Sequence, residues 1–133
     1  MKEKGEGGEV SEAGLGDMHR IGGGGVENLR LKPQEAILTP PGISLLQSSS
    51  PGEAARQIQE AFPAADRLHE ATRVIGSTTV DSIRRGGFDG IPRPTRKLPN
   101  HYRLIHPEGA RGFNDANLIR LSAVFTDTSG HVS

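Results

Sequence analysis

Apolar and polar positions alternate in a way that predicts strands and helices in turn between residues 43 and 125. Residues 43–46, Ile-Ser-Leu-Leu, have the composition of a short strand. The next segment predicts a helix, with Ser50 as N-cap, Pro51 at the first helical position and Glu53 closing a capping box. Apolar residues at 54, 55, 58, 61 and 62 follow a 3.6-residue period, and Pro63 ends the helix.

The second half of the chain repeats this alternation. Residues 73–76 predict a strand, and the helix that follows begins after Thr78 or Thr79 and ends at the glycines of positions 86 and 87. A proline-rich loop covers residues 88–100, and residues 101–106 predict a third strand. A final helix is predicted from about residue 115 to 125, with Asn114 as its cap.

These elements predict an α/β domain, a small β-α-β-α-β-α layer of three or so short strands with at least some parallel pairing. The domain is expected to cover residues 33–126 and to be followed by a polar C-terminal tail at 127–133. Residues 1–32 are predicted to form a flexible Gly-rich tail, because nine of the 18 glycines lie in the first 25 residues. A core of about 90 residues is small, so a partner protein or a homo-oligomer is expected.

Composition excludes several classes of protein. The 133 residues set a ceiling of one ordinary domain, and the absence of cysteine excludes disulfides, thiolate metal sites and a cysteine nucleophile. No motif with metal-ligand spacing is present, so neither a metal nor a cofactor is predicted. With no run of 18 apolar residues and no apolar leader, we expect no membrane contact and a cytoplasmic location.

Charge is balanced overall, with 16 basic and 16 acidic residues, but it is unevenly placed. The segment 84–120 holds eight basic residues against three acidic ones. Arginine forks bind phosphate and carboxylate, so this segment predicts an anionic partner: a nucleic acid, a nucleotide or an acidic protein face. The alternative is a solvated loop. The candidate partner- or anion-binding residues are Arg84, Arg85, Arg93, Arg96, Lys97, Arg111, Ser77 and Thr78.

Two histidines are candidates for catalysis. His101 and His106 lie five apart on one predicted strand, so their side chains should point to opposite faces and should not share a metal. Either could act as a general base beside Arg103 and Tyr102, with the basic segment stabilising a phosphate. The alternative is a structural hydrogen bond at the end of a strand.

The segment Gly76-Ser77-Thr78-Thr79 is similar to the Ser-Thr-Ser element of ADP-ribosyltransferases. Backbone amides at the start of a helix can bind an anion, and these hydroxyls would add donors. The pattern departs from the family because no Glu-x-Glu follows, so the carboxylate that stabilises a cationic sugar is missing. Helix capping is the simpler interpretation of these hydroxyls.

The C-terminal half also resembles small bacterial proteins of multi-gene cassettes. The similar segments are residues 87–95, 99–101, 104–109, 112–118 and 125–130, with the pattern IPxPT, PNHxRLIHPEG and GFxDxNL. The resemblance covers residues 32–130 and carries no catalytic residue with it. It favours a domain that docks on a partner protein, in a toxin–antitoxin, secretion or defence cassette. A toxin-like ribonuclease or nucleotide-acting enzyme, and a nucleic-acid-binding protein, are the two alternatives.

Overall fold

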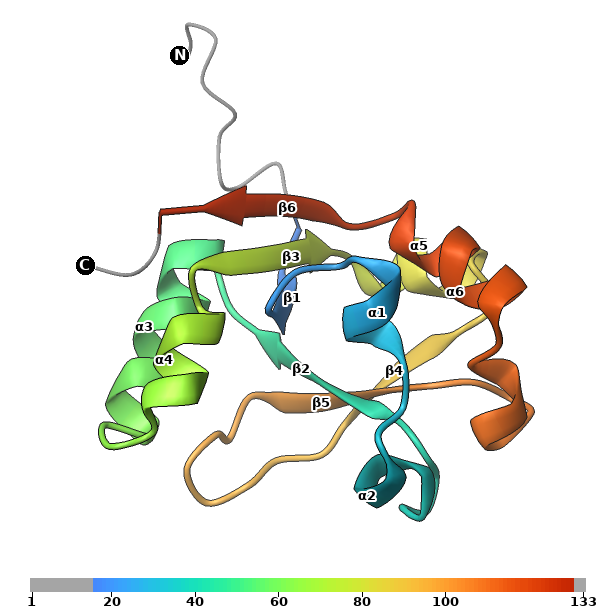
Figure 1. Cartoon of the computed structure of the whole chain (residues 1–133), viewed down its shortest axis with the longest axis horizontal. Coiled ribbons are helices and arrows are strands. Elements are labelled where there is room, and N and C mark those ends of the chain that lie inside the picture. The colour runs from blue at the N-terminus through green and yellow to red at the C-terminus, as the bar shows by residue number, and fades with distance from the viewer. Residues whose placement is uncertain (1–15, 131–133) are drawn as a thin grey trace, which may run out of the picture.

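The computed structural model describes residues 16–130, which form a mixed α/β domain around one six-stranded sheet (Figure 1). The strand order is β4-β5-β2-β1-β3-β6, and every neighbouring pair is antiparallel. The strands are β1 (Met18–Ile21), β2 (Ile43–Gln47), β3 (Val74–Thr78), β4 (Asp89–Pro92), β5 (His101–Ile105) and β6 (Thr126–Ser129).

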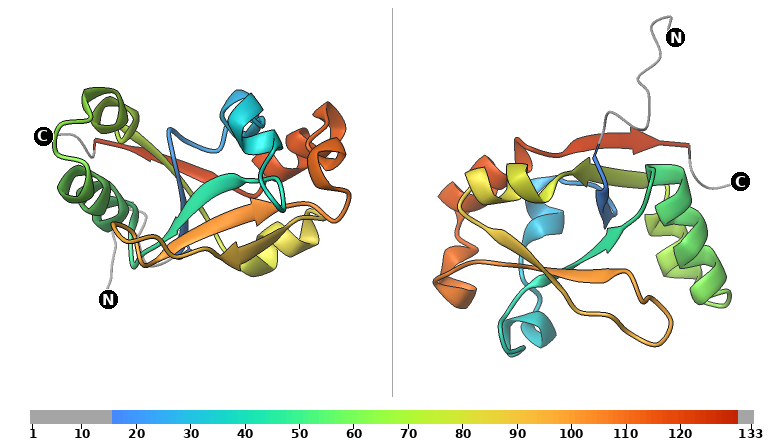
Figure 2. Two further views of the ribbon diagram at one scale, coloured as in Figure 1. Left: turned by 90° about the horizontal axis from the view of Figure 1, so that it is seen from below. Right: turned by 180° about the vertical axis from the view of Figure 1, so that it is seen from behind.

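Helices gather in two groups at the two ends of this sheet (Figures 1 and 2). One group is α3 (Pro51–Ala61) and α4 (Asp66–Ala71). The other holds α1 (Val26–Leu29), α5 (Val80–Arg85), the 3-10 helix η2 (Gly109–Gly112) and α6 (Asp115–Ser122), with the short α2 (Pro33–Ala36) below α1. No helix within residues 16–130 is long and apolar enough to cross a membrane.

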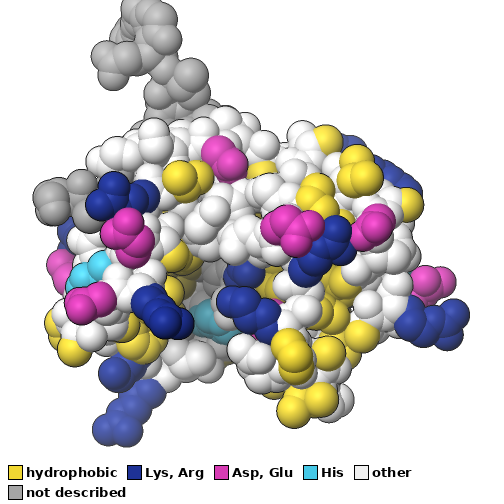
Figure 3. Space-filling model, in the orientation of Figure 1, with side chains coloured by type: hydrophobic (Ala, Val, Ile, Leu, Met, Phe, Trp, Pro, Cys, Tyr) yellow, Lys and Arg dark blue, Asp and Glu magenta, His cyan; other side chains and the backbone are white. Residues whose placement is uncertain are grey.

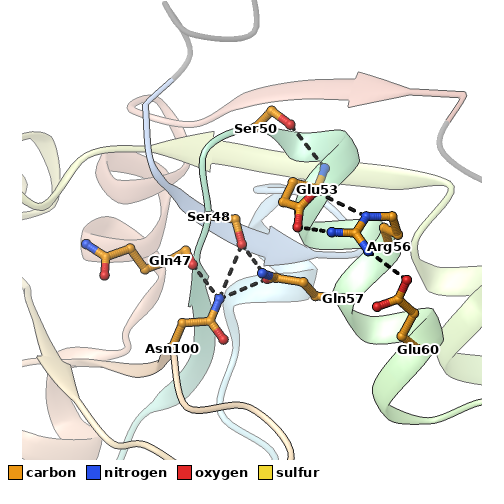
Figure 4. Close-up of polar contacts among 8 residues, drawn as sticks. All are labelled: Gln47, Ser48, Ser50, Glu53, Arg56, Gln57, Glu60 and Asn100. Carbon is orange, nitrogen blue, oxygen red and sulfur yellow. Dashed lines mark hydrogen bonds and ion pairs between the residues drawn. The ribbon is translucent and has the colours of Figure 1, made fainter.

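The helix starts follow from local side-chain caps. Ser50 accepts a hydrogen bond from the amide of Glu53 at 3.1 Å, and Thr79 and Asn114 cap α5 and α6 in the same way. These three predicted starts are confirmed. The predicted capping box is wrong in one detail, because the Glu53 carboxylate pairs with Arg56 (Figure 4).

The topology differs from the expected layer. The α/β class is confirmed, but the expected parallel pairing is wrong, because all ladders are antiparallel. Strand β1 lies between β2 and β3, so the helices α3 and α4 connect two strands that are not neighbours. Strand–helix alternation favours parallel pairing only when consecutive strands lie side by side.

The central strand β1 comes from the segment that was expected to be a tail. Residues 16–32 contain β1 and α1, whereas the tail predicted for residues 1–15 lies outside the described residues. The glycines after β1 pack closely: a Cβ at Gly24 would overlap the side chain of Phe125, and one at Gly76 would meet the backbone amide of Gly24 at 2.5 Å. Glycine is needed here because two backbones touch, not because the chain is a linker.

Two further strands lie where loops were predicted. Strand β4 occupies residues 89–92 of the expected proline-rich loop, and β6 occupies residues 126–129 at the expected start of the polar tail. Both are edge strands, so each pairs on one side only. Neither shows the apolar alternation of a strand buried on one face, which explains why the pattern did not reveal them.

Buried apolar side chains form two clusters. The larger, which we call the main core, consists of Met18, Leu29, Ile43, Leu45, Ile83, Phe88, Leu104, Phe113, Leu118 and Leu121. The smaller, the cavity-side cluster, consists of Leu46, Ala54, Ile58 and Leu98. Because side chains alternate along β2, Leu45 joins the main core and Leu46 faces the other cluster.

Candidate functional site

The candidate site lies where β1 and β2 separate. Their ladder contains only the pairs Met18–Gln47 and His19–Leu46, after which β1 continues along β3 and β2 continues along β5. The separation leaves the backbone carbonyl of Ser44 without a ladder partner on that side. Arg20 replaces the missing ladder donor, since its Nη1 donates to the Ser44 carbonyl at 3.1 Å.

Arg20 is a buried cation held by backbone carbonyls. Its Nε and Nη2 donate to the carbonyl of Asn28 at 3.0 and 2.7 Å, and its side chain is only 8% exposed. Burial lowers the pKa of Arg20, and the negative charge of Glu35 partly opposes this shift. No carboxylate within residues 16–130 forms an ion pair with this guanidinium. A buried charge of this kind is stabilised by an anion that can approach it.

A cavity of about 430 Å³ opens beside Arg20. Figure 3 shows a hollow on this face, between the α3–α4 end and the α1–α2 end, with Lys or Arg and His side chains at its walls. Its apolar wall is formed by Ile21, Leu46, Ile58, Phe62, Leu68 and Leu98, and its polar wall by His19, Arg20, Asn28, Lys32, Ser44 and His101. The cavity is therefore lined by both positively charged and apolar side chains.

Ser44 and His101 meet in this cavity. His101 pairs with Leu46 in the β2–β5 ladder, so Ser44 is its diagonal neighbour on the same face. The ring Nε2 lies 2.9 Å from the Ser44 hydroxyl, and Nδ1 lies 2.8 Å from the carbonyl of Arg93. A carbonyl only accepts, so Nδ1 carries the proton of the neutral ring and Nε2 accepts from the serine hydroxyl.

A cluster of amides and a hydroxyl fixes the start of β5 next to His101 (Figure 4). The side-chain nitrogen of Asn100 donates to the carbonyl of Gln47, to the hydroxyl of Ser48 at 3.3 Å and to Oε1 of Gln57 at 2.9 Å. The Ser48 hydroxyl also donates to Gln57 at 2.6 Å. These bonds tie the loop before β5 to both β2 and α3, and so position His101.

His19 ties three elements together beneath the cavity. It is fully buried, with Nε2 donating to the carbonyl of Ser48 at 2.9 Å and Nδ1 2.8 Å from the hydroxyl of Ser77. Ser77 is therefore hydrogen-bonded to a side chain of β1 and does not cap a helix. The hydroxyl of Thr78 is buried and has no hydrogen-bond partner among the described residues, while Thr79 is the actual cap of α5.

Among the residues predicted from the sequence, His101 lines the cavity. Three basic residues belong to the adjoining loop: the Arg93 carbonyl orients His101, Arg96 is exposed, and Lys97 lies over the ring of Phe62, 5.0 Å from its centre. Thr95 and Leu98 of the same loop contribute to the cavity wall. The structure therefore places part of the predicted basic segment at the rim of this site.

The remaining predicted residues do not line this cavity. His106 follows the opposite end of β5, where its ring packs edge-on against Phe88 and its Nδ1 accepts from the amide of Glu108. The other residues have contacts of their own: Arg84 pairs with Asp89, Arg85 donates to Ser82, Arg103 donates to the carbonyl of Pro40, Tyr102 packs on the main core, and the Arg111 carbonyl accepts from Asn114. The predicted set of His101, His106, Tyr102 and Arg103 is thus not assembled in one pocket.

Sequence reasoning missed Arg20, Ser44 and Lys32. Arg20 stands in the run Met-His-Arg-Ile, whose four residues are enough for a strand, but the surrounding glycines hid that signal. Ser44 lies in a segment whose pattern predicts a strand, but only the pairing of β2 with β5 shows that His101 lies beside it. No group of three metal-ligating side chains comes together in the described part of the chain.

Neither protein-family models, nor curated proteins, nor solved structures give a match to this chain.

Proposed function

We propose that this domain binds a nucleotide in the cavity between β1, β2 and the α3–α4 pair. The observation that carries the proposal is the buried guanidinium of Arg20, which lines the cavity and whose hydrogen-bond partners within residues 16–130 are backbone carbonyls. Three of its five N–H donors are used by those carbonyls, which leaves two for an anion. A phosphate group fits this fork.

The apolar lining residues account for the rest of the ligand. Phe62, Leu68 and Leu98 supply an apolar surface on which a base or another flat ring can lie, and Lys32 adds a second cation. The volume of about 430 Å³ falls within the usual range for small-molecule sites, roughly 300–1,000 Å³. A ligand with both a phosphate and an aromatic ring satisfies both walls.

AMP carries one phosphate and one base and is therefore the simplest nucleotide to test, with NAD⁺ as a dinucleotide for comparison. Docking on a partner protein stays a prediction, as does binding of a nucleic acid by residues 84–120.

Equilibrium dialysis tests the proposal. The chain has no Trp and one Tyr, so nucleotide absorbance at 260 nm is measured against almost no protein signal. We expect AMP and NAD⁺ to bind and adenosine, which lacks the phosphate, to bind at least about tenfold more weakly. Arg20→Gln should lower the affinity for AMP by about 10- to 100-fold, because a hydrogen bond to a charged group contributes about 1.5–3 kcal/mol.

Two matched variants make the result specific. Arg85→Gln removes an exposed arginine that does not line the cavity and should leave the affinity unchanged within about twofold. Lys32→Gln changes an exposed residue of the cavity wall and should weaken AMP binding even if Arg20→Gln does not fold. Equal affinity of the wild type and Lys32→Gln, or equal binding of AMP and adenosine, would contradict the proposal.

A further inference from the structure

The cavity holds a hydroxyl that is hydrogen-bonded to an imidazole. Ser44 is exposed to the cavity and lies outside both apolar clusters. Its hydroxyl faces Nε2 of His101 at 2.9 Å, while the carbonyl of Arg93 holds Nδ1 at 2.8 Å. The Ser44 hydroxyl, the His101 ring and the Arg93 carbonyl thus form a hydrogen-bonded series. A nucleophile, its base and a group that orients the base are arranged in this way.

We propose that Ser44 is a nucleophile, activated by His101, that attacks the phosphorus of a phosphate ester held in the cavity. The substrate class rests on the proposed nucleotide binding, whereas the activated serine rests on its own geometry. Phosphate is favoured over an acyl group because Arg20 and Lys32 line the same cavity, and cations stabilise the charge that develops on phosphoryl oxygens.

The reaction balances without a further reagent. The Ser44 proton moves to Nε2 of His101, an Oγ–P bond forms, the ester P–O bond breaks, and the leaving oxygen takes that proton from His101. Water then attacks phosphorus while His101 accepts one of its protons. The Oγ–P bond breaks in this second step, and Ser44 recovers a proton from His101. Overall, one water cleaves one ester bond.

The main chain of Arg93 positions His101. Its amide donates to the main-chain carbonyl of His101 at 2.9 Å, and its own carbonyl accepts from Nδ1, so Arg93 fixes both the main chain and the ring of His101. Arg20 in turn holds the Ser44 carbonyl at 3.1 Å. The serine and the histidine are therefore fixed by main-chain bonds and do not depend on each other for their placement.

Labelling of the full chain with diisopropyl fluorophosphate tests the nucleophile. This reagent needs no nucleotide recognition: Ser44 Oγ bonds to phosphorus, fluoride leaves, and the proton goes to His101. We expect a single adduct by intact mass, mapped to Ser44 by peptide sequencing, and none in Ser44→Ala. His101→Gln should slow labelling by about 100-fold or more. Ser49→Ala, an exposed serine outside the cavity, should label like the wild type.

The outcomes separate this inference from the proposed function. An unlabelled wild type, or labelling that Ser44→Ala or His101→Gln leaves unchanged, would overturn the inference, with circular dichroism showing that each variant is folded. An adduct at Ser44 that saturating AMP prevents supports both proposals. An adduct that AMP does not affect supports the nucleophile and counts against nucleotide binding. Binding of AMP by a chain that is never labelled would leave the proposed function and remove the inference.

Discussion

The main core and the cavity-side cluster lie against the same sheet but are packed differently. The main core contains ten buried apolar residues, including Phe88 and Phe113, whose rings meet edge-on with centres 5.3 Å apart. The cavity-side cluster contains four and borders a cavity of about 430 Å³. On that side, polar side chains such as Arg20 and Asn100 join the elements. One side is closely packed, and the other borders a cavity.

The largest effect is expected from a truncation in the main core. Leu104 of β5 is fully buried, so Leu104→Ala should lower the free energy of unfolding by about 2–5 kcal/mol, through lost apolar burial and the remaining cavity. Urea unfolding followed by circular dichroism measures it. Ile119→Ala serves as the control, because that side chain is 63% exposed and should cost less than about 0.5 kcal/mol. A similar loss in both variants would show that the main core is not closely packed.

A smaller effect is expected at the polar junction beside the cavity. Asn100→Ala removes the donor that reaches Gln47, Ser48 and Gln57, and should lower the free energy of unfolding by about 1–2 kcal/mol. Asn100→Asp keeps the shape but loses the donor, so it should be at least as destabilised as the alanine variant. If Asn100→Asp matched the wild type in urea unfolding, the cluster would not hold the loop to β2 and α3.

The smallest effect is expected at the start of α3, which carries part of the cavity wall. Ser50→Ala removes the cap that accepts from the Glu53 amide at 3.1 Å, and should cost about 1 kcal/mol. Ser49→Ala changes the neighbouring exposed serine and should cost much less. Thermal melts of the two variants, measured side by side, compare them directly. Equal melting temperatures would contradict the assignment of the cap.

Local signals explain how much of the fold could be predicted. The caps at Ser50, Thr79 and Asn114 act on amides three residues away, so the sequence around each helix start contains the whole interaction. Strand β1 depends instead on partners 29 and 58 residues away, such as the carbonyl of Ser48 and the hydroxyl of Ser77 that bind His19. No local pattern reveals that a buried histidine in a Gly-rich segment has such partners.

The candidate site likewise combines a residue that the local sequence singles out with residues that only the fold brings together. His101 could be singled out because a histidine at a predicted strand start, next to a basic loop, is chemically conspicuous. Arg20 and Ser44 could not, since they come from two other strands, and they meet His101 only because β1 and β5 flank β2. The charge count over residues 84–120 predicts an anionic partner, and that stays a prediction, whereas the buried cation of the cavity lies outside that segment.

Nuclear magnetic resonance of the ¹⁵N-labelled full chain, titrated with AMP, tests the central claim most directly. Binding in the cavity predicts amide shifts at Ile21, Ser44 and Leu98 and at the start of β5, with little change at main-core residues such as Leu118. Shifts confined to the amides of Arg84, Arg85 and Arg111 would place the anion on the basic segment instead. That result, or a spectrum that AMP leaves unchanged, would contradict a nucleotide site between β1 and β2.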